Sequence, residues 1–207
     1  MIETTLAAKC EKADFKKIFE KKGYKFFTKG VYNLNIIGVR RKGNKITNTY
    51  DDCLVVIYNT DTAKDVKRIF RFTTLPGKKA MDHPTNVKGT AILVPGQYLG
   101  SHIIRLHRGK YKALCQDRPI SVYRDNNKDD KYDFVPTYID NGVFGINIHK
   151  AGSYDNIIIN GWSYGCQVFY RNIDFNSFMS LVNKSAKIYG DRFTYTLITE
   201  EDLDLGL

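Results

Sequence analysis

The feature that most constrains the fold is a series of short apolar runs between residues 31 and 124. The runs are rich in Val, Ile, Tyr and Phe, and each is bounded by Gly, Pro or Asn, which is typical of β-strands joined by turns. Examples are CLVVIY at 53–58, RIFRFTT at 68–74 and GTAILVPGQY at 89–98. All are strand-sized and too short to span a bilayer as helices. We therefore predict a domain built mainly of β-sheet, without a membrane span.

Two segments depart from this pattern and are predicted to be helices. In residues 14–22, Asp14 provides an N-cap before an apolar stripe, and Gly23 ends the segment. In residues 174–190 the apolar side chains recur at helical spacing up to Gly190. The predicted fold class is therefore mainly β with α (α+β), with a short N-terminal helix and an amphipathic helix near the C-terminus.

The length and composition favour one domain with a small addition. The chain has 207 residues, of which 43% are hydrophobic and 26% charged, which is enough to bury a core. We predict a helical appendage over residues 1–30 and a sheet domain over residues 31–207. The first residues lack a basic head followed by an apolar run, so we predict a protein that is cytoplasmic as synthesised.

The net charge is positive, because 32 Lys and Arg outnumber 22 Asp and Glu to give +10. Such a charge attracts polyanions such as nucleic acid, anionic cell-wall polymers or acidic lipid. The basic residues are dispersed and no nucleic-acid-binding motif accompanies them, so a nucleic-acid partner is not expected. A solvated basic surface is the first interpretation, and a groove facing a polyanion is the second.

Metal and disulfide sites are not expected. The four cysteines, Cys10, Cys53, Cys115 and Cys166, lie far apart without a CxxC pair, which argues for reduced thiols. Residues 125–133 place acidic and amide side chains at calcium-loop spacing, but the glycine and the final glutamate of that loop are missing. We interpret this segment as a solvated turn, and predict no cofactor.

His149 and Cys166 are the candidates for chemistry. A nucleophilic cysteine needs a base to take its proton and donors for the oxyanion that its attack creates. His149 can be the base, and the small residue Gly165 lets backbone N–H groups approach Cys166. The alternative is that both are buried structural residues, which is common for a free cysteine and for a single histidine.

A motif favours the catalytic interpretation. The sequence GINIH, ending at His149, is followed after residues 150–162 by Ser163, Tyr164, Gly165 and Cys166. This order and spacing resemble the signature of the L,D-transpeptidase catalytic domain (YkuD-like family), in which a strand ending in His precedes a loop and then Ser/Thr-His-Gly-Cys. Shorter similarities extend the resemblance from about Tyr32 to Ile198, and they are most like divergent phage and bacterial versions of the domain. The implied fold is an L,D-transpeptidase-like β-sandwich or barrel.

The resemblance implies an enzyme that transfers acyl groups on peptidoglycan stem peptides, or hydrolyses them, without a cofactor. Cys166 would be the nucleophile and His149 the base. Ser163 would support the site, and the backbone amides of Gly165 and Cys166 would bind the oxyanion. The lack of a leader sequence favours a phage-encoded enzyme of wall remodelling or lysis, acting at the cell wall or in the virion.

The chain departs from the family pattern at two positions. Tyr164 replaces the usual His, and Val168 replaces a polar Arg or Asn, with the polar Gln167 beside it. Recognition of the substrate carboxylate is what these changes put in question, because an Arg holds a carboxylate efficiently. Arg108 or Arg124 could supply that charge from elsewhere, and Tyr164 and Gln167 are further candidates for substrate contacts.

Two more residues have two interpretations each. Trp162 either anchors the core, which is the default, or forms a wall of the substrate groove. His107, next to Arg108, either lines the cleft or belongs to the polar face of an edge strand. The departures from the family also keep a non-catalytic alternative open, in which the same fold serves as a structural or wall-binding component of a virion.

Overall fold

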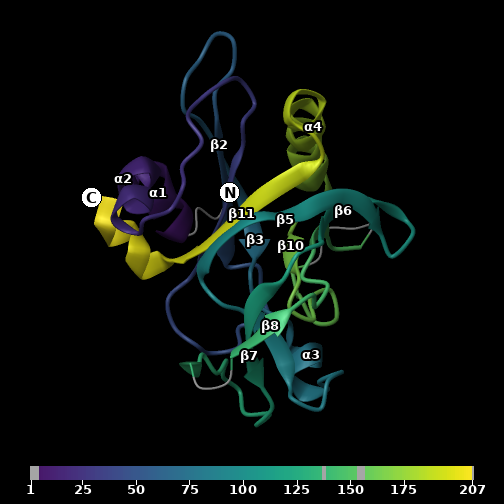
Figure 1. Cartoon of the computed structure of the whole chain (residues 1–207). Coiled ribbons are helices and arrows are strands. Elements are labelled where there is room, and N and C mark those ends of the chain that lie inside the picture. The colour runs from purple at the N-terminus through teal and green to yellow at the C-terminus, as the bar shows by residue number, and fades with distance from the viewer. Residues whose placement is uncertain (1–4, 137–138, 153–156, 207) are drawn as a thin grey trace.

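Eight strands form a closed barrel in a computed structural model that describes residues 5–136, 139–152 and 157–206 (Figure 1). Around the barrel the strands follow the order β1 (Asn35–Arg40), β11 (Arg192–Thr199), β5 (Gly96–His107), β6 (Tyr111–Gln116), β9 (Ile148–Lys150), β10 (Gln167–Phe169), β3 (Val66–Thr73) and β2 (Asp52–Tyr58). Most neighbours are antiparallel, while β1 pairs with β11, and β9 with β10, in parallel. The predicted mainly β fold with few helices is confirmed.

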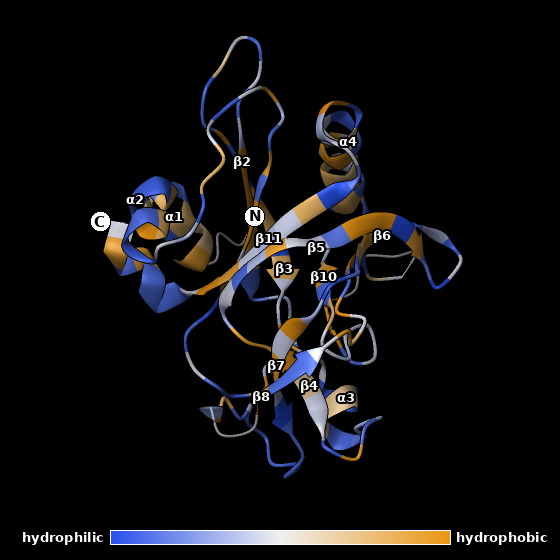
Figure 2. Ribbon diagram, viewed as in Figure 1, coloured by the Kyte–Doolittle hydropathy of each residue, from blue (hydrophilic) through white to orange (hydrophobic). Residues whose placement is uncertain are grey.

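A second, smaller sheet lies beside one end of the barrel (Figure 1). It contains β4 (Thr90–Leu93), β7 (Ile120–Asp125) and β8 (Ile139–Gly142), paired in that order. The short helix α3 (Lys78–Asp82) is next to it. Figure 2 shows that β8 is hydrophilic, whereas the barrel strands carry long apolar stretches.

The main core lies within the barrel and beneath helix α4 (Asn172–Tyr189). Phe175, Phe178 and Val182 of this helix are buried in the same cluster as Phe169 of β10. The ring of Phe169 contacts those of Phe175 and Phe178, with centroids 5.7 and 5.1 Å apart. The predicted amphipathic helix therefore exists, and it supports the strand that follows Cys166.

A second core lies outside β1 and β2, whose residues are buried on both faces. It is covered by α1 (Thr5–Lys12), α2 (Phe15–Lys21) and the 3-10 helix η2 (Glu200–Gly206), which Figure 1 shows together on one side. Asp14 caps α2 by accepting hydrogen bonds from Lys16 N and Lys17 N, as the sequence predicts. The boundary at residue 30 stays a prediction, although these helices share a core with the barrel.

The segment GVFGINIH does not form one continuous strand. Strand β8 ends at Gly142 and β9 begins only at Ile148. Gly145 lies between them with φ +73°, a left-handed conformation that breaks a strand and suits glycine. In the other half of the motif, Cys166 immediately precedes β10.

Helices α1 and α3 were not predicted individually, because each has only 8 or 5 residues. None of the helices in the described ranges is long and apolar enough to cross a membrane. The polar segment 125–133 is a loop that closes on itself: Asp125 Oδ2 accepts from Asp133 N at 2.8 Å, and Asp129 Oδ1 accepts from Lys131 N at 2.9 Å. The second of these contacts is an Asx-type turn, as the sequence predicts, and the first closes the base of the loop.

Candidate active site

The parallel pairing of β9 with β10 brings the two candidate residues to one face. Val168 lies opposite His149, and Gln167 N donates to the Asn147 carbonyl at 2.8 Å. The same register places Cys166 beside Asn147. Because alternate residues of a strand face the same side, and so do paired residues on neighbouring strands, His149 and Cys166 project from one face as diagonal neighbours.

Gln167 points the other way, so its predicted role in substrate binding is wrong. It is fully buried, its Oε1 accepts a hydrogen bond from Tyr195 OH at 2.7 Å, and its Nε2 donates to Gly165 O at 3.1 Å. Period-two alternation explains the error: the residue after a surface-facing Cys166 must face the barrel core. Gln167 is therefore a structural residue that ties the turn before β10 to β11.

Cys166 is partly exposed as a residue, but its thiol is not activated in the resting protein. Cys166 is partly exposed, whereas Cys10, Cys53 and Cys115 are buried. Its Sγ donates to the Gly145 carbonyl at 3.3 Å. Burial of the sulfur raises the thiol pKa to about 11, although the Asn147 backbone N–H and Arg108 oppose this shift. The group is therefore a protonated thiol at neutral pH.

The imidazole of His149 is held as a neutral base. His149 is 4% exposed, and its Nδ1 lies 2.7 Å from the Lys150 carbonyl. A carbonyl only accepts hydrogen bonds, so Nδ1 carries the ring proton and Nε2 keeps a lone pair. Burial is the main cause that lowers the pKa of His149 to about 3; repulsion from a protonated His107 and from Arg108 contributes, and the Lys150 carbonyl opposes the shift.

The resting site is thus a neutral thiol beside a neutral imidazole, and not a thiolate–imidazolium pair. Within the described residues no hydrogen bond joins the two side chains, since each bonds a backbone carbonyl. For proton transfer the thiol must leave the Gly145 carbonyl and turn to His149. A general base works best when its pKa lies near the working pH, so the low pKa of His149 disfavours proton transfer in the resting protein.

The turn before Cys166 is fixed from within. Ser163 is fully buried; its Oγ donates to the Cys166 carbonyl at 2.7 Å and accepts from Gly165 N at 3.2 Å. Gly165 has φ +114°, and a Cβ there would lie 2.5 Å from the Ala91 carbonyl oxygen of β4. Glycine is required here by packing. Because the Gly165 N–H is already bonded to Ser163, its predicted role as an oxyanion donor is corrected, while that of the Cys166 amide stays a prediction.

The turn between β5 and β6 adds His107 and Arg108 to the site. The ring of His107 stacks on that of His149, with centroids 4.2 Å apart and planes 19° apart. Arg108 is exposed, has φ +50°, and lies near enough to lower the pKa values of the Cys166 thiol and of both histidines. The LHRGKYKAL segment therefore borders the candidate site and is not a remote edge.

Tyr164 and Arg124 meet in a neighbouring cavity of about 250 Å³, which Phe144 also lines. Arg124 Nη1 donates to the Gly89 carbonyl at 3.1 Å, and its guanidinium lies over the Phe144 ring at 4.9 Å. Phe144 immediately precedes Gly145, whose carbonyl accepts from the thiol. The cavity thus lies near the Gly145 and Cys166 segments along the chain, but neither Cys166 nor His149 lines it.

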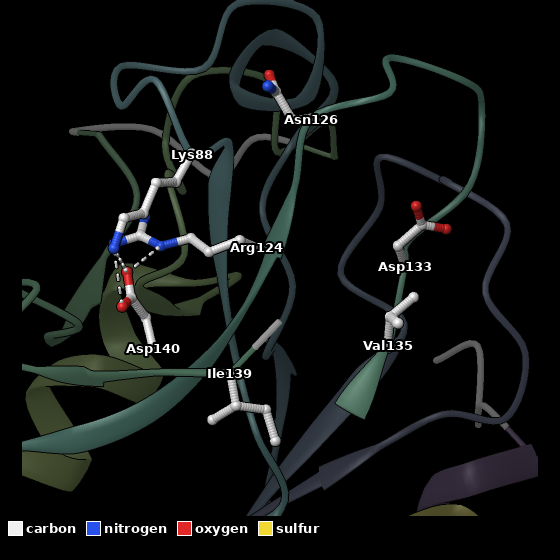
Figure 3. A pocket seen from close by; sticks show the side chains of 7 residues that line it. All are labelled: Lys88, Arg124, Asn126, Asp133, Val135, Ile139 and Asp140. Carbon is white, nitrogen blue, oxygen red and sulfur yellow. Dashed lines mark hydrogen bonds and ion pairs between the residues drawn. The ribbon is translucent and has the colours of Figure 1, made fainter. Parts of the chain in front are cut away.

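A larger cavity of about 630 Å³ also includes Arg124 (Figure 3). Lys88 and Arg124 both pair with Asp140, at 3.2 and 3.1 Å, while Asp133 lies across the hollow. The remaining lining residues are Asn126, Val135 and Ile139. The positive charge of Arg124 is thus already partnered, which makes Arg108 the less engaged of the two predicted carboxylate ligands.

Trp162 is 41% exposed, so the default expectation that it anchors the core is wrong. Its ring lies over Gly152, where an added Cβ would come within 2.6 Å of it. It forms part of the surface next to the Ser163 turn, which is where a groove wall would lie.

One residue of the site, Asn147, was missed. Its backbone N–H faces the Cys166 sulfur, and its side-chain Nδ2 lies 3.2 Å from His107 Nδ1. The signal was present, because in INIH the polar residue two positions before His149 must share its face. In the parts of the chain that the structure describes, no cluster of three or more His, Cys, Asp or Glu could hold a metal ion.

Comparison of the chain with protein-family models, with curated proteins and with solved structures found no significant match. The similarity to L,D-transpeptidases therefore rests on the motif in the sequence. The geometry of Cys166, His149 and their neighbours indicates which chemistry these residues could perform together.

Proposed function

We propose that the protein is a cysteine-dependent enzyme of L,D-transpeptidase-like fold, which transfers acyl groups on peptidoglycan stem peptides or hydrolyses those peptides. The observation that carries the proposal is the shared face of β9 and β10. There the only partly exposed cysteine of the four is a diagonal neighbour of a histidine whose Nε2 keeps its lone pair. Two unrelated structural residues would not need a partly exposed cysteine, a histidine with a free Nε2 lone pair, and a strand register that places them as diagonal neighbours.

In the proposed reaction the Cys166 sulfur attacks the carbonyl carbon of the stem peptide while its proton moves to Nε2 of His149. The tetrahedral intermediate collapses by breaking the C–N bond, and His149 gives the proton to the leaving amine. An acceptor amine or a water molecule then attacks the thioester. Its proton passes to His149 and then to the sulfur, which regenerates the thiol and leaves a new amide or a carboxylate.

The surroundings of the thiol support a peptide substrate with a carboxylate. Arg108 places positive charge near the sulfur, and a cavity lined by Tyr164 and Phe144 offers aromatic walls on the segments that flank Cys166 and Gly145. The net charge of +10 favours approach to anionic cell-wall polymers. We propose the cell wall or the virion as the place of action, with phage-encoded wall remodelling or lysis as the role.

Purified muropeptides test the proposal. We expect wild-type protein to create or remove cross-links, detected by mass spectrometry of the products, and Cys166→Ala to be inactive. Cys10→Ala is the matched control, since it removes a buried thiol in α1, outside the candidate site, and should keep the activity. Identical products from wild type and Cys166→Ala would refute the enzymatic role.

A second candidate function is non-catalytic binding to the cell wall. It is favoured by one observation: the thiol is protonated and tied to the Gly145 carbonyl, with Val168 buried where the family has a polar residue. In that case wild type and Cys166→Ala would sediment equally with purified sacculi, and neither would change the muropeptides.

A further inference from the structure

The stacked pair of His107 and His149 is the feature that the proposed reaction does not yet use. The rings are nearly parallel at 4.2 Å, and the two residues are only 7% and 4% exposed. They come from different parts of the barrel, since His107 ends β5 and His149 lies in β9. If His149 becomes protonated during the reaction, the face of the His107 ring lies where it can interact electrostatically with that charge.

The protonation state of His107 is set by Asn147. The Asn147 Oδ1 accepts from Gln116 N at 2.9 Å, which fixes the orientation of the amide and directs its Nδ2 towards His107 Nδ1 at 3.2 Å. An amide N–H only donates, so Nδ1 of His107 must accept and cannot carry a proton. His107 is therefore held neutral, with its proton on Nε2.

We propose that His107 is a positioning residue for His149: its neutral ring holds the base in place and stabilises the charge that the base gains from Cys166. This inference rests on the proposed function. A cation over an aromatic face is stabilised by the ring electrons, and more strongly when water is excluded. A protonated His107 would do the opposite, because two like charges at this separation repel.

The groups around the pair make such stabilisation necessary. The titratable and charged neighbours are Arg108 on the β5–β6 turn, Tyr111 and Cys115 on β6, Lys150 on β9, and Cys166 before β10. Arg108 disfavours a second positive charge at His149. The Lys150 ammonium lies over the Tyr111 ring, 5.1 Å from its centroid, so its charge interacts with Tyr111. The face of His107 is thus the nearest aromatic support for an imidazolium.

The kinetic test compares His107→Ala with His107→Phe on muropeptides. Loss of the ring should lower kcat by about three- to thirtyfold and leave KM nearly unchanged, while Phe, which keeps an aromatic face, should stay within about threefold of wild type. Asn147→Asp should also lower kcat, because a carboxylate favours a protonated His107, and the loss should diminish as the pH is raised. Equal activity of His107→Ala and wild type, or of the Phe and Ala variants, would overturn the inference.

A second measurement needs no substrate. By ¹⁵N NMR, wild-type His149 should carry its proton on Nδ1 alone, whereas in His107→Ala both tautomers should appear and the pKa of His149 should fall, because the charged ring loses its aromatic support. A merely structural His107 would lower the melting temperature without changing the tautomer of a still-folded variant. If wild type turns over no muropeptide, the proposed function fails, and the NMR result alone decides whether His107 positions His149.

Discussion

Ser163→Ala is the change that most directly probes how the turn before Cys166 is built. The substitution removes one hydroxyl, which donates to the Cys166 carbonyl at 2.7 Å and accepts from Gly165 N at 3.2 Å in a fully buried setting. Leaving a buried donor or acceptor without a partner costs about 1–3 kcal/mol each. Two such groups give a loss of about 2–6 kcal/mol, with the lower end expected if water reaches the turn beside the partly exposed Cys166.

The free energy of unfolding, measured in urea, should show this loss. For a chain of this size the melting temperature should fall by roughly 4–24 °C. Ser180→Ala is the matched control, because Ser180 is exposed on α4, and its replacement should change stability by about 0.5 kcal/mol or less. A Ser163→Ala protein as stable as the control would refute the hydrogen-bonding scheme on which the site is built.

Three further predictions follow from the same geometry. Iodoacetamide should modify Cys166 before the three buried cysteines, at a rate that keeps rising with pH towards the thiol pKa of about 11, as peptide mapping of the labelled protein would show. Burial lowers the pKa of His102 to about 4, so between pH 6.5 and 4 the unfolded chain binds more protons than the folded one, and the free energy of unfolding should fall as the pH drops. In urea titrations, His102→Gln should remove up to about 3 kcal/mol of this pH dependence. Gly165→Ala should lose about 2–5 kcal/mol in the same assay, through its φ of +114° and the contact with the Ala91 carbonyl, and an unchanged protein would contradict both causes.

Local patterns predicted the elements that have strong local signals. The cap at Asp14 and the apolar period after Phe175 were enough for α2 and α4, and the runs of β-branched residues were enough for most strands. The closure of the barrel was not predictable in this way. It depends on the parallel pairing of β1 with β11, whose residues are far apart in the chain.

The candidate site could be predicted in its residues but not in its chemistry. The spacing of the motif indicated Cys166 and His149 as candidates. Gly165 was predicted to be an oxyanion donor, whereas in the structure it is required by its positive φ and its close packing against the Ala91 carbonyl. Burial could not be predicted, and burial decides that the thiol and the imidazole rest in their neutral forms. The stack on His107 joins segments 42 residues apart (149 − 107), a contact that no local pattern indicates.

Covalent trapping tests the central claim most directly. Wild-type protein is mixed with a tetrapeptide muropeptide, quenched in acid and examined by mass spectrometry of the intact chain and of its peptides. The account predicts an acyl adduct on the peptide that contains Cys166, which hydroxylamine releases because it is a thioester, and no adduct on Cys166→Ala. The absence of any adduct, or an adduct at another residue, would contradict the assignment of Cys166 as the nucleophile.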